Sequence, residues 1–271
     1  MKRRQLFEFT DLRFWPNAFR GLLTDFLDFA GDIARPFQPH SDLLAEVLNA
    51  AKVDVITDLC SGARGPWSYL LPRVEEILGR KISVRLTDKF PYHGRSDKGH
   101  QRISYETAPV DVLCHSGGLP GVWSMFDAFH HFAPENAKII LKRAVEEGHP
   151  VAIFEMLQRS ASDALLALRI PLLVLLLTPF IRPHNFRRFL FTYIVPIAPL
   201  AIGWDGLVSI LRCYSPEELL EMAQSVSGSS YIWKAEAYRK GVVSVTYLIG
   251  YPKINASEYN PCEDLTSKKT G

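Results

Sequence analysis

The sequence of 271 residues is poor in cysteine, nearly neutral in net charge, and without an uncharged apolar run of membrane-spanning length. Its four cysteines are scattered and form no Cys-x-x-Cys pair: Cys60, Cys114, Cys213 and Cys262. This spacing argues against a structural zinc site and a disulfide framework, and it suits a reducing cytoplasm. A formal net charge of +2 is too small to indicate the concentrated basic face of nucleic-acid-binding proteins, so we expect no nucleic acid partner.

Signals for export and for metal binding are absent as well. The N-terminus is basic, but Glu8, Asp11 and Arg13 interrupt any apolar signal region, so we expect a cytoplasmic protein. The histidine, aspartate and glutamate residues show no tight grouping with the spacing of metal ligands, so we expect no metal.

The composition is that of a globular protein, and the middle of the chain alternates between two patterns. Short apolar runs predict buried parallel strands over 53–58, 82–88, 122–129 and 151–154. Amphipathic stretches, each opening with a proline, predict helices over 66–78 and 134–147, and a capped helix over 215–226 precedes closing strands over 231–239 and 242–250. The predicted fold is α/β and Rossmann-like, a doubly wound, mostly parallel sheet with helices on both faces.

The segments outside this alternation suggest the domain organisation. Residues 1–50 are rich in aromatic and acidic residues and predict an N-terminal helical lid. The Rossmann-like domain is expected over 51–255 and includes an apolar helical insertion over 156–206, after the strand at 151–154. The polar segment 256–271 is expected to be a flexible tail.

The strongest motif, Asp58-Leu59-Cys60-Ser61-Gly62-Ala63-Arg64-Gly65, lies directly between a predicted strand and a predicted helix. The glycines allow a tight turn with close backbone approach to a ligand, and the helix start offers free N–H groups. The spacing is not G-x-G-x-x-G, and an opening acid suits a ligand with a cationic amino-acid end. A plain turn between strand and helix is the alternative. The motif residues expected to bind cofactor are Asp58, Cys60, Ser61, Gly62 and Gly65.

Two more acids follow later strand positions. Asp88 ends the strand over 82–88, where a carboxylate can accept hydrogen bonds from both hydroxyls of a ribose. Asp111 follows the third strand position, where a side chain could meet an adenine amino group. Acidic residues also end strands simply because they form turns, so a purely structural role stays open for both Asp88 and Asp111.

These residues resemble the class I S-adenosylmethionine-dependent methyltransferase family over about 53–155, together with the segment Phe129-His130-His131-Phe132. More narrowly, the chain resembles a bacterial branch of that family with three shared features. They are the Asp-Leu-Cys-Ser-Gly turn followed by Gly65-Pro66-Trp67, an N-terminal Phe14-Trp15-Pro16, and a later Trp204-Asp205-Gly206. The resemblance implies S-adenosylmethionine as cofactor and methyl transfer as activity. Ser61 and Arg64 depart from the glycines common in the family, and Arg64 could crowd the methionine end of the cofactor or point to solvent.

Methyl transfer needs alignment of acceptor and methyl group, and it needs a base only where the acceptor must lose a proton. His130 and His131 follow the strand over 122–129, at the carboxyl end of the sheet, and either is a candidate base. Adjacent strand residues face opposite ways, so we expect only one, His130 in preference, to face the acceptor. Alternatively, these histidines could have a structural role, capping the following helix or bonding a backbone carbonyl. Glu155 ends the next strand and is expected at the substrate.

The insertion contains two uncharged apolar blocks, 170–181 and 189–204, separated by Arg182, His184, Arg187 and Arg188. Both blocks are shorter than a spanning helix and contain prolines, so we expect no transmembrane span. In methyltransferases of this class such insertions cover the acceptor, which implies a small, apolar acceptor here. Trp15 and Trp204 are expected to help bind it. The open alternatives are an enzyme docked on a membrane surface with a lipid or quinone-like acceptor, a homodimer interface, and a scaffold without catalysis.

Overall fold

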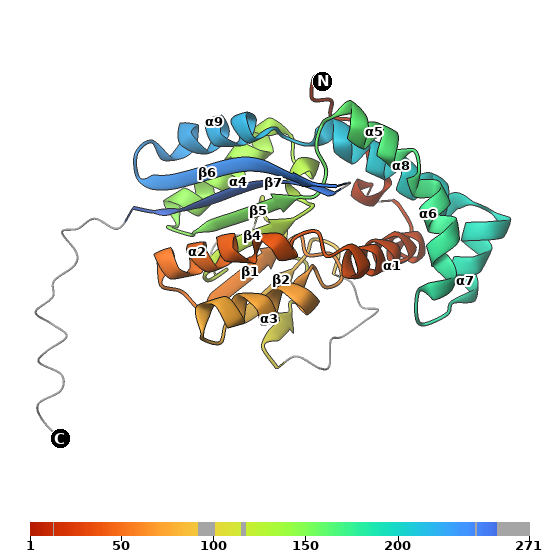
Figure 1. Ribbon diagram of the computed structural model, residues 1–271, viewed down its shortest axis with the longest axis horizontal. Coiled ribbons are helices and arrows are strands. Elements are labelled where there is room, and N and C mark those ends of the chain that lie inside the picture. The colour runs from red at the N-terminus through yellow and green to blue at the C-terminus, as the bar shows by residue number, and fades with distance from the viewer. Residues whose placement is uncertain (13, 92–100, 115–117, 242, 254–271) are drawn as a thin grey trace, which may run out of the picture.

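The computed structural model describes residues 1–12, 14–91, 101–114, 118–241 and 243–253; the predicted tail over 256–271, with Cys262, lies outside them. A seven-stranded sheet forms the centre of the molecule, in the order β3-β2-β1-β4-β5-β7-β6 (Figure 1). Its strands are β1 (Val55–Leu59), β2 (Ser83–Thr87), β3 (Ile103–Tyr105), β4 (Val122–Phe126), β5 (Val151–Glu155), β6 (Tyr231–Lys240) and β7 (Val243–Pro252).

The first five strands are parallel, and β7 runs antiparallel to both β5 and β6. The mostly parallel Rossmann-like sheet and its closing strand pair are therefore confirmed. The sequence analysis missed β3, which has only three residues and none fully buried, so it leaves no apolar run in the sequence.

Helices cover both faces of the sheet, as the strand–helix alternation predicts. One face packs on α2 (Ser41–Ala51) and α3 (Trp67–Leu78), and the other on α4 (Pro134–Glu146) and α9 (Pro216–Ser227). The side chains of β5 show the reason, because they alternate between the two cores: Ala152 and Phe154 belong to the α2–α3 core, and Val151 and Ile153 to the α4–α9 core.

The predicted N-terminal lid over 1–50 divides into two parts. Its last helix, α2, packs on α3 and belongs to the layer covering the sheet. The earlier part comprises the 3₁₀ turn η1 (Phe9–Asp11) and helix α1 (Asn17–Ala34), followed by the short turn η2 (Gln38–His40). In Figure 1, α1 lies between the sheet and the insertion, beyond the end of the strands.

The insertion forms helices beyond α1, on the side away from the sheet (Figure 1). Its elements are α5 (Ala161–Ala167), α6 (Ile170–Leu177), η4 (Thr178–Phe180), α7 (Phe186–Phe189), the π-helical η5 (Leu190–Ile194) and α8 (Ile197–Arg212). It forms a small core with α1 that includes Leu23, Phe26, Val174 and Ile202.

The first part of the insertion corrects the expected length of its apolar helix. Ala161–Phe180 runs as 20 residues with a mean hydropathy of 1.9, and among the described residues it is the one helix long and apolar enough to cross a membrane. A second run, Phe186–Ile194 with Ile197–Arg212, passes the same test only as a pair bent by 76°. The prolines do not break the first run, because Pro171 and Pro179 each lie in a first turn, where no backbone N–H is needed.

Candidate functional site

The glycine-containing loop leaves β1 at the carboxyl edge of the sheet and has three residues with positive φ. They are Cys60 (57°), Gly62 (61°) and Gly65 (58°). A Cβ on Gly65 would lie 2.7 Å from Oδ2 of Asp58, so both φ and close packing require glycine there. A Cβ on Gly62 would have no atom within 4 Å, so open space lies in front of the loop at this residue.

Asp58 is buried under this loop, and both of its carboxylate oxygens are engaged by the protein. Ser124 Oγ donates to Oδ1 at 2.7 Å and Trp67 Nε1 donates to Oδ2 at 2.9 Å. Burial raises the pKa of Asp58 to about 7, although the two donors lower it. The carboxyl group thus ties β1 to β4 and to the start of α3, a different set of partners from the cationic ligand end expected from the sequence. The contacts of Asp58 also explain why the Gly-Pro-Trp motif has a glycine at 65 and a tryptophan at 67.

Asp88 follows β2 and lies beside Gly62. Its Oδ2 accepts the Gly62 N–H at 2.9 Å, and its Oδ1 accepts the Phe90 N–H at 2.7 Å. Burial raises the pKa of the Asp88 carboxyl group, while these two backbone donors lower it. The two strongest sequence signals, the loop and the acid after the second strand, therefore meet at one point of the sheet edge.

Ser61 and Asp111 lie at the same edge. The Ser61 N–H and Oγ both donate to the carbonyl oxygen of Thr87, at 2.9 and 3.3 Å. Asp111 accepts the Leu113 N–H at 3.1 Å and pairs with Lys89 at 2.6 Å. The N–H of the adjoining Val110 donates to the Asp88 carbonyl at 2.9 Å. This hydrogen bond brings Asp111 near Asp88 at the edge of the sheet.

Arg64 neither crowds the loop nor points simply to solvent. Its guanidinium group pairs with Asp32 at 2.7 Å and Asp28 at 3.3 Å, both on α1. Burial raises the pKa of Asp28 to about 6, and Arg64 opposes that rise. A second link joins α1 to the loop after β2, because the Arg20 guanidinium carbon lies 4.3 Å from the centre of the Phe90 ring. The lid helix is therefore tied to both loops of the predicted cofactor site.

His130 and Glu155 form a buried pair on the turn η3 (Phe129–His131) and the end of β5. Oε1 of Glu155 accepts the backbone N–H groups of Phe129 and His130, at 2.7 and 3.1 Å. Oε2 lies 2.5 Å from Nδ1 of His130. A carboxylate only accepts, so this contact places the imidazole proton on Nδ1 and leaves Nε2 as an acceptor. Nε2 is buried and has no hydrogen-bond partner among the residues that the structure describes.

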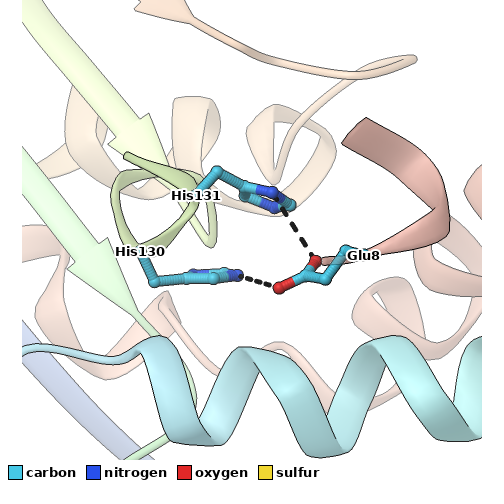
Figure 2. Close-up of side chains that lie close together, drawn as sticks. All are labelled: Glu8, His130 and His131. Atoms are coloured by element: carbon cyan, nitrogen blue, oxygen red, sulfur yellow. Dashed lines mark ion pairs between the residues drawn. The ribbon is translucent and has the colours of Figure 1, made fainter. Parts of the chain in front are cut away.

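Figure 2 shows the rings of both histidines directed at Glu8, and further charged residues surround His131. Its Nδ1 lies 2.8 Å from Asp11 and 3.5 Å from Glu8, and Glu8 in turn lies 3.8 Å from Nε2 of His130. Arg212 pairs with Glu8 at 3.1 Å and with Asp11 at 2.6 Å. Burial alone would lower the pKa of His131, but the carboxylates of Glu8 and Asp11 raise it to about 9. His131 is therefore protonated at neutral pH, and its ring is not available as a base.

The fold also brings together three side chains whose ligand atoms lie close enough to hold a metal ion, and their positions in the sequence do not show this. Glu8, His130 and His131 each offer a ligand atom within 4.8 Å of the others, and the expected absence of a metal stays a prediction. Residue 8 is too far from residue 130 in sequence for any local motif to show this grouping. In this structure the Arg212 guanidinium supplies the positive charge between the Glu8 and Asp11 carboxylates.

The N-terminal strap (residues 3–12) carries Glu8 and Asp11 to this place. The Asp205 carboxylate holds the strap in place, because its two oxygens accept the Phe9 N–H at 2.8 Å and the Thr10 N–H at 3.3 Å. Trp204 Nε1 donates to the Phe7 carbonyl at 3.0 Å. A Cβ on Gly206 would lie 2.4 Å from Ile170, so glycine lets α8 pack on α6. The Trp-Asp-Gly motif thus holds the strap over the histidine pair.

Trp15 and Trp204, predicted together from opposite ends of the chain, line one open apolar hollow of about 390 Å³. Its walls come from the strap and its neighbours and from α8: Phe7, Phe9, Trp15, Ile197, Leu200, Ala201 and Trp204. Glu155 is not among the residues that line this hollow, and its carboxylate contacts His130 instead.

Sequence reasoning missed Asp127, which follows β4. Its φ is 49°, and its Oδ1 accepts the Met156 N–H at 2.5 Å. Burial and the neighbouring Glu155 carboxylate raise the pKa of Asp127 to about 7. The signal was available, because Asp127 follows β4 as Asp88 follows β2.

No protein-family model and no curated protein matches the sequence, but solved structures match the fold. The chain is similar to the plantazolicin methyltransferase BpumL in complex with a monoazolic desmethylPZN analog and SAH, with a TM-score of 0.54 and 10% identity over 86% of this chain and 90% of that one. This likeness shows that the two chains share the class I methyltransferase fold.

Two further solved structures match with lower scores. Human N-acetylserotonin methyltransferase in complex with SAM has a TM-score of 0.47 and 12% identity, over 86% of this chain and 57% of that chain. An O-methyltransferase from neocarzinostatin biosynthesis has a TM-score of 0.42 and 16% identity, over 83% of this chain and 57% of that chain. This chain spans a little over half the length of each.

Proposed function

We propose that this protein transfers the methyl group of S-adenosylmethionine to a small, apolar acceptor, with His130 as the base. The observation that carries the proposal is the meeting of the glycine loop and Asp88 at the carboxyl edge of the sheet, with His130 in the turn after the adjacent strand β4 and held by Glu155. In open α/β sheets, ligands bind outside the carboxyl ends of the strands.

The residues at this edge fit the cofactor. Asp88 would accept hydrogen bonds from the ribose hydroxyls, and the backbone of 60–65 would face the methionine end, where the space in front of Gly62 is open. Asp111 would meet the adenine amino group. When bound, S-adenosylmethionine supplies a methyl group already activated by the sulfonium. Asp58 would act beneath the loop, holding its shape through Trp67 and Ser124.

The chain's own residues would then handle the acceptor proton. Glu155 fixes the tautomer and orientation of His130, so that Nε2 can take a proton from the acceptor. The Glu155 carboxylate, which contacts Nδ1, would also stabilise the imidazolium that results. Because the strap covers Nε2, acceptor entry requires the strap to move.

An apolar acceptor is supported by the aromatic residues around the strap. Trp15 packs between Phe9 and Phe19, with ring centres 4.6 and 5.4 Å away, and the hollow that it lines has apolar residues alone. The alternative that this protein is a scaffold without catalysis was based on Arg64 blocking the cofactor loop. Arg64 pairs with Asp28 and Asp32 of α1, which speaks against this argument for a scaffold.

Calorimetric titration with S-adenosylmethionine and S-adenosylhomocysteine tests the proposal. We expect micromolar or tighter binding of both, followed by methylation of members of an apolar phenol and amine panel. Absence of binding by protein with a cooperative thermal transition would contradict the proposal and favour the scaffold.

A further inference from the structure

The outer side of the insertion is apolar where a globular protein is normally polar. Along the helical run Ala161–Phe180, the buried side chains recur as Asp163, Ala167, Val174 and Thr178, and this side packs toward the rest of the molecule. The opposite side carries exposed residues at helical spacing, which we call the outer apolar face: Leu165, Leu168, Leu172, Leu176 and Phe180.

This face is large for a monomeric protein. Only 22% of the apolar window in this helix is buried, and Leu172 and Leu176 are 57% and 58% exposed. The neighbouring return segment, which contacts α6, adds exposed Ile194 and Leu200. Contiguous apolar surfaces of this kind mark interaction sites.

The charges around the face identify its partner. From 164 to 204 the sequence contains no aspartate or glutamate, and its charged residues are all arginines: Arg169, Arg182, Arg187 and Arg188. Arg169 is exposed within the apolar stripe, between Leu168 and Leu172, and Arg187 is exposed on α7, beyond the end of the stripe at Phe180. An apolar face that carries arginines and no acidic residues complements a bilayer with anionic headgroups.

The anchoring of the helix decides between spanning and lying on a membrane. Its start is held to the sheet, because Asp163 accepts the Ser244 hydroxyl at 2.9 Å and pairs with Arg239. Its far end is followed by Arg188, which donates to the Ile181 carbonyl at 3.0 Å and pairs with Asp25 of α1. A helix with one side packed on the acid-bearing α1 cannot be surrounded by lipid.

We infer that the outer apolar face docks in the plane of an anionic lipid surface, with the leucines and Phe180 in the headgroup–acyl boundary and Arg169 and Arg187 at the phosphates. The inference rests on this face alone and stands independently of the proposed methyl transfer. A hydrophobic acceptor would then be available directly from the lipid phase, next to the hollow between Trp15 and Trp204.

Co-sedimentation with vesicles tests the inference, using phosphatidylcholine alone and phosphatidylcholine mixed with phosphatidylglycerol. We expect the wild-type protein to bind the mixed vesicles more strongly and to lose part of that binding at high salt. Leu172→Gln with Leu176→Gln should lower the partition coefficient at least about tenfold. Arg169→Gln with Arg187→Gln should remove the preference for phosphatidylglycerol.

The matched control replaces two similarly exposed residues on the helices that cover the sheet. Ile77 and Ile139 are 42% and 45% exposed, and their double glutamine variant should bind vesicles as the wild type does. Wild-type protein that stays in the supernatant, or a leucine variant that binds as well as the control, would overturn the inference. So would a wild-type dimer that the leucine variant makes monomeric in the absence of vesicle binding, because the face would then join two copies of this chain.

Discussion

Glu155 Oε2 and His130 Nδ1 lie 2.5 Å apart in a buried environment, and the other oxygen of Glu155 accepts two backbone N–H groups of the histidine turn. The carboxylate therefore determines both where the imidazole lies and which nitrogen carries its proton. His131, one residue on, is held by different carboxylates and protonated. Two adjacent histidines thus differ in chemistry because different segments of the chain supply their partners.

Replacing His130 by alanine should slow turnover by about 10²-fold or more, because the acceptor proton loses its base. Affinity for S-adenosylmethionine should stay unchanged, since His130 lies outside the glycine loop. Glu155→Gln replaces a group that only accepts at Nδ1 by an amide that can donate there, so kcat should fall while the KM for cofactor does not change. His184→Ala, on the insertion, serves as the control. Turnover of the His130 variant at the wild-type rate would exclude this residue as the base.

Replacing Asp88 by alanine should weaken S-adenosylmethionine binding by about 1–3 kcal/mol, because the ribose hydroxyls and the Gly62 N–H lose their acceptor. Calorimetric titration measures the change. Glu76→Gln removes an exposed acid of α3 and should leave the affinity as it is. Equal affinities for Asp88→Ala and wild type would show that the ribose lies elsewhere.

Two glycines of one loop provide a matched pair for stability. Gly62→Ala should cost about 1–2 kcal/mol of unfolding free energy, the cost of a side chain at positive φ in open space. Gly65→Ala should cost more, because its Cβ would also lie 2.7 Å from Asp58 Oδ2 and displace the Trp67 hydrogen bond. Urea denaturation of both variants gives the difference, and equal losses would mean that the Asp58 contact adds nothing.

Asp58→Asn should change how stability depends on pH. In the wild type, the folded-state pKa of Asp58 is raised from 3.8 to about 7, so the folded protein binds the extra proton in that interval. Its contribution therefore favours folding at low pH and declines as pH rises through about 7. The asparagine variant lacks this decline, so its unfolding free energy should gain on the wild type between those two pH values. A constant difference across the interval would contradict the raised pKa.

His131 should contribute in the same direction as Asp58, over a higher pH range. Its pKa is raised from 6.5 to about 9, so its stabilising effect is fully present below about pH 6.5 and is lost as pH rises through about 9. The pKa of its partner Asp11 is lowered from 3.8 to about 2, so that contribution is lost as pH falls through about 2. The stability difference between wild type and His131→Gln should shrink from pH 6.5 to 9, and NMR titration of the imidazole gives the pKa directly.

The sequence predicted the parts of the fold that local patterns encode. Buried strands leave apolar runs, and helices open with proline or a cap, so β1, β2, β4, β5 and the closing pair could all be predicted. The short edge strand β3 has no fully buried residue and leaves no such pattern. The apolar helix of the insertion was expected to be too short, because its first residues, Ala161–Ala167, are not uniformly apolar.

The site could be predicted only where its residues follow strands. The loop, Asp88 and His130 meet at the sheet edge because parallel strands bring their carboxyl ends together. Glu8 and Asp11 reach the histidines through a strap whose position depends on Asp205, and no spacing rule connects residues so distant in sequence. The pairing of Arg64 with α1 was missed for the same reason.

The strap also has a consequence for the order in which the chain acquires its structure. Its contacts to α8 and to the histidine turn join residues separated by 196 and 127 positions in sequence. Contacts of such separation form late, since a long loop must close first. During synthesis Phe9 thus lacks its Asp205 partner until the chain has grown by 196 residues, so the step that covers His130 comes late in folding.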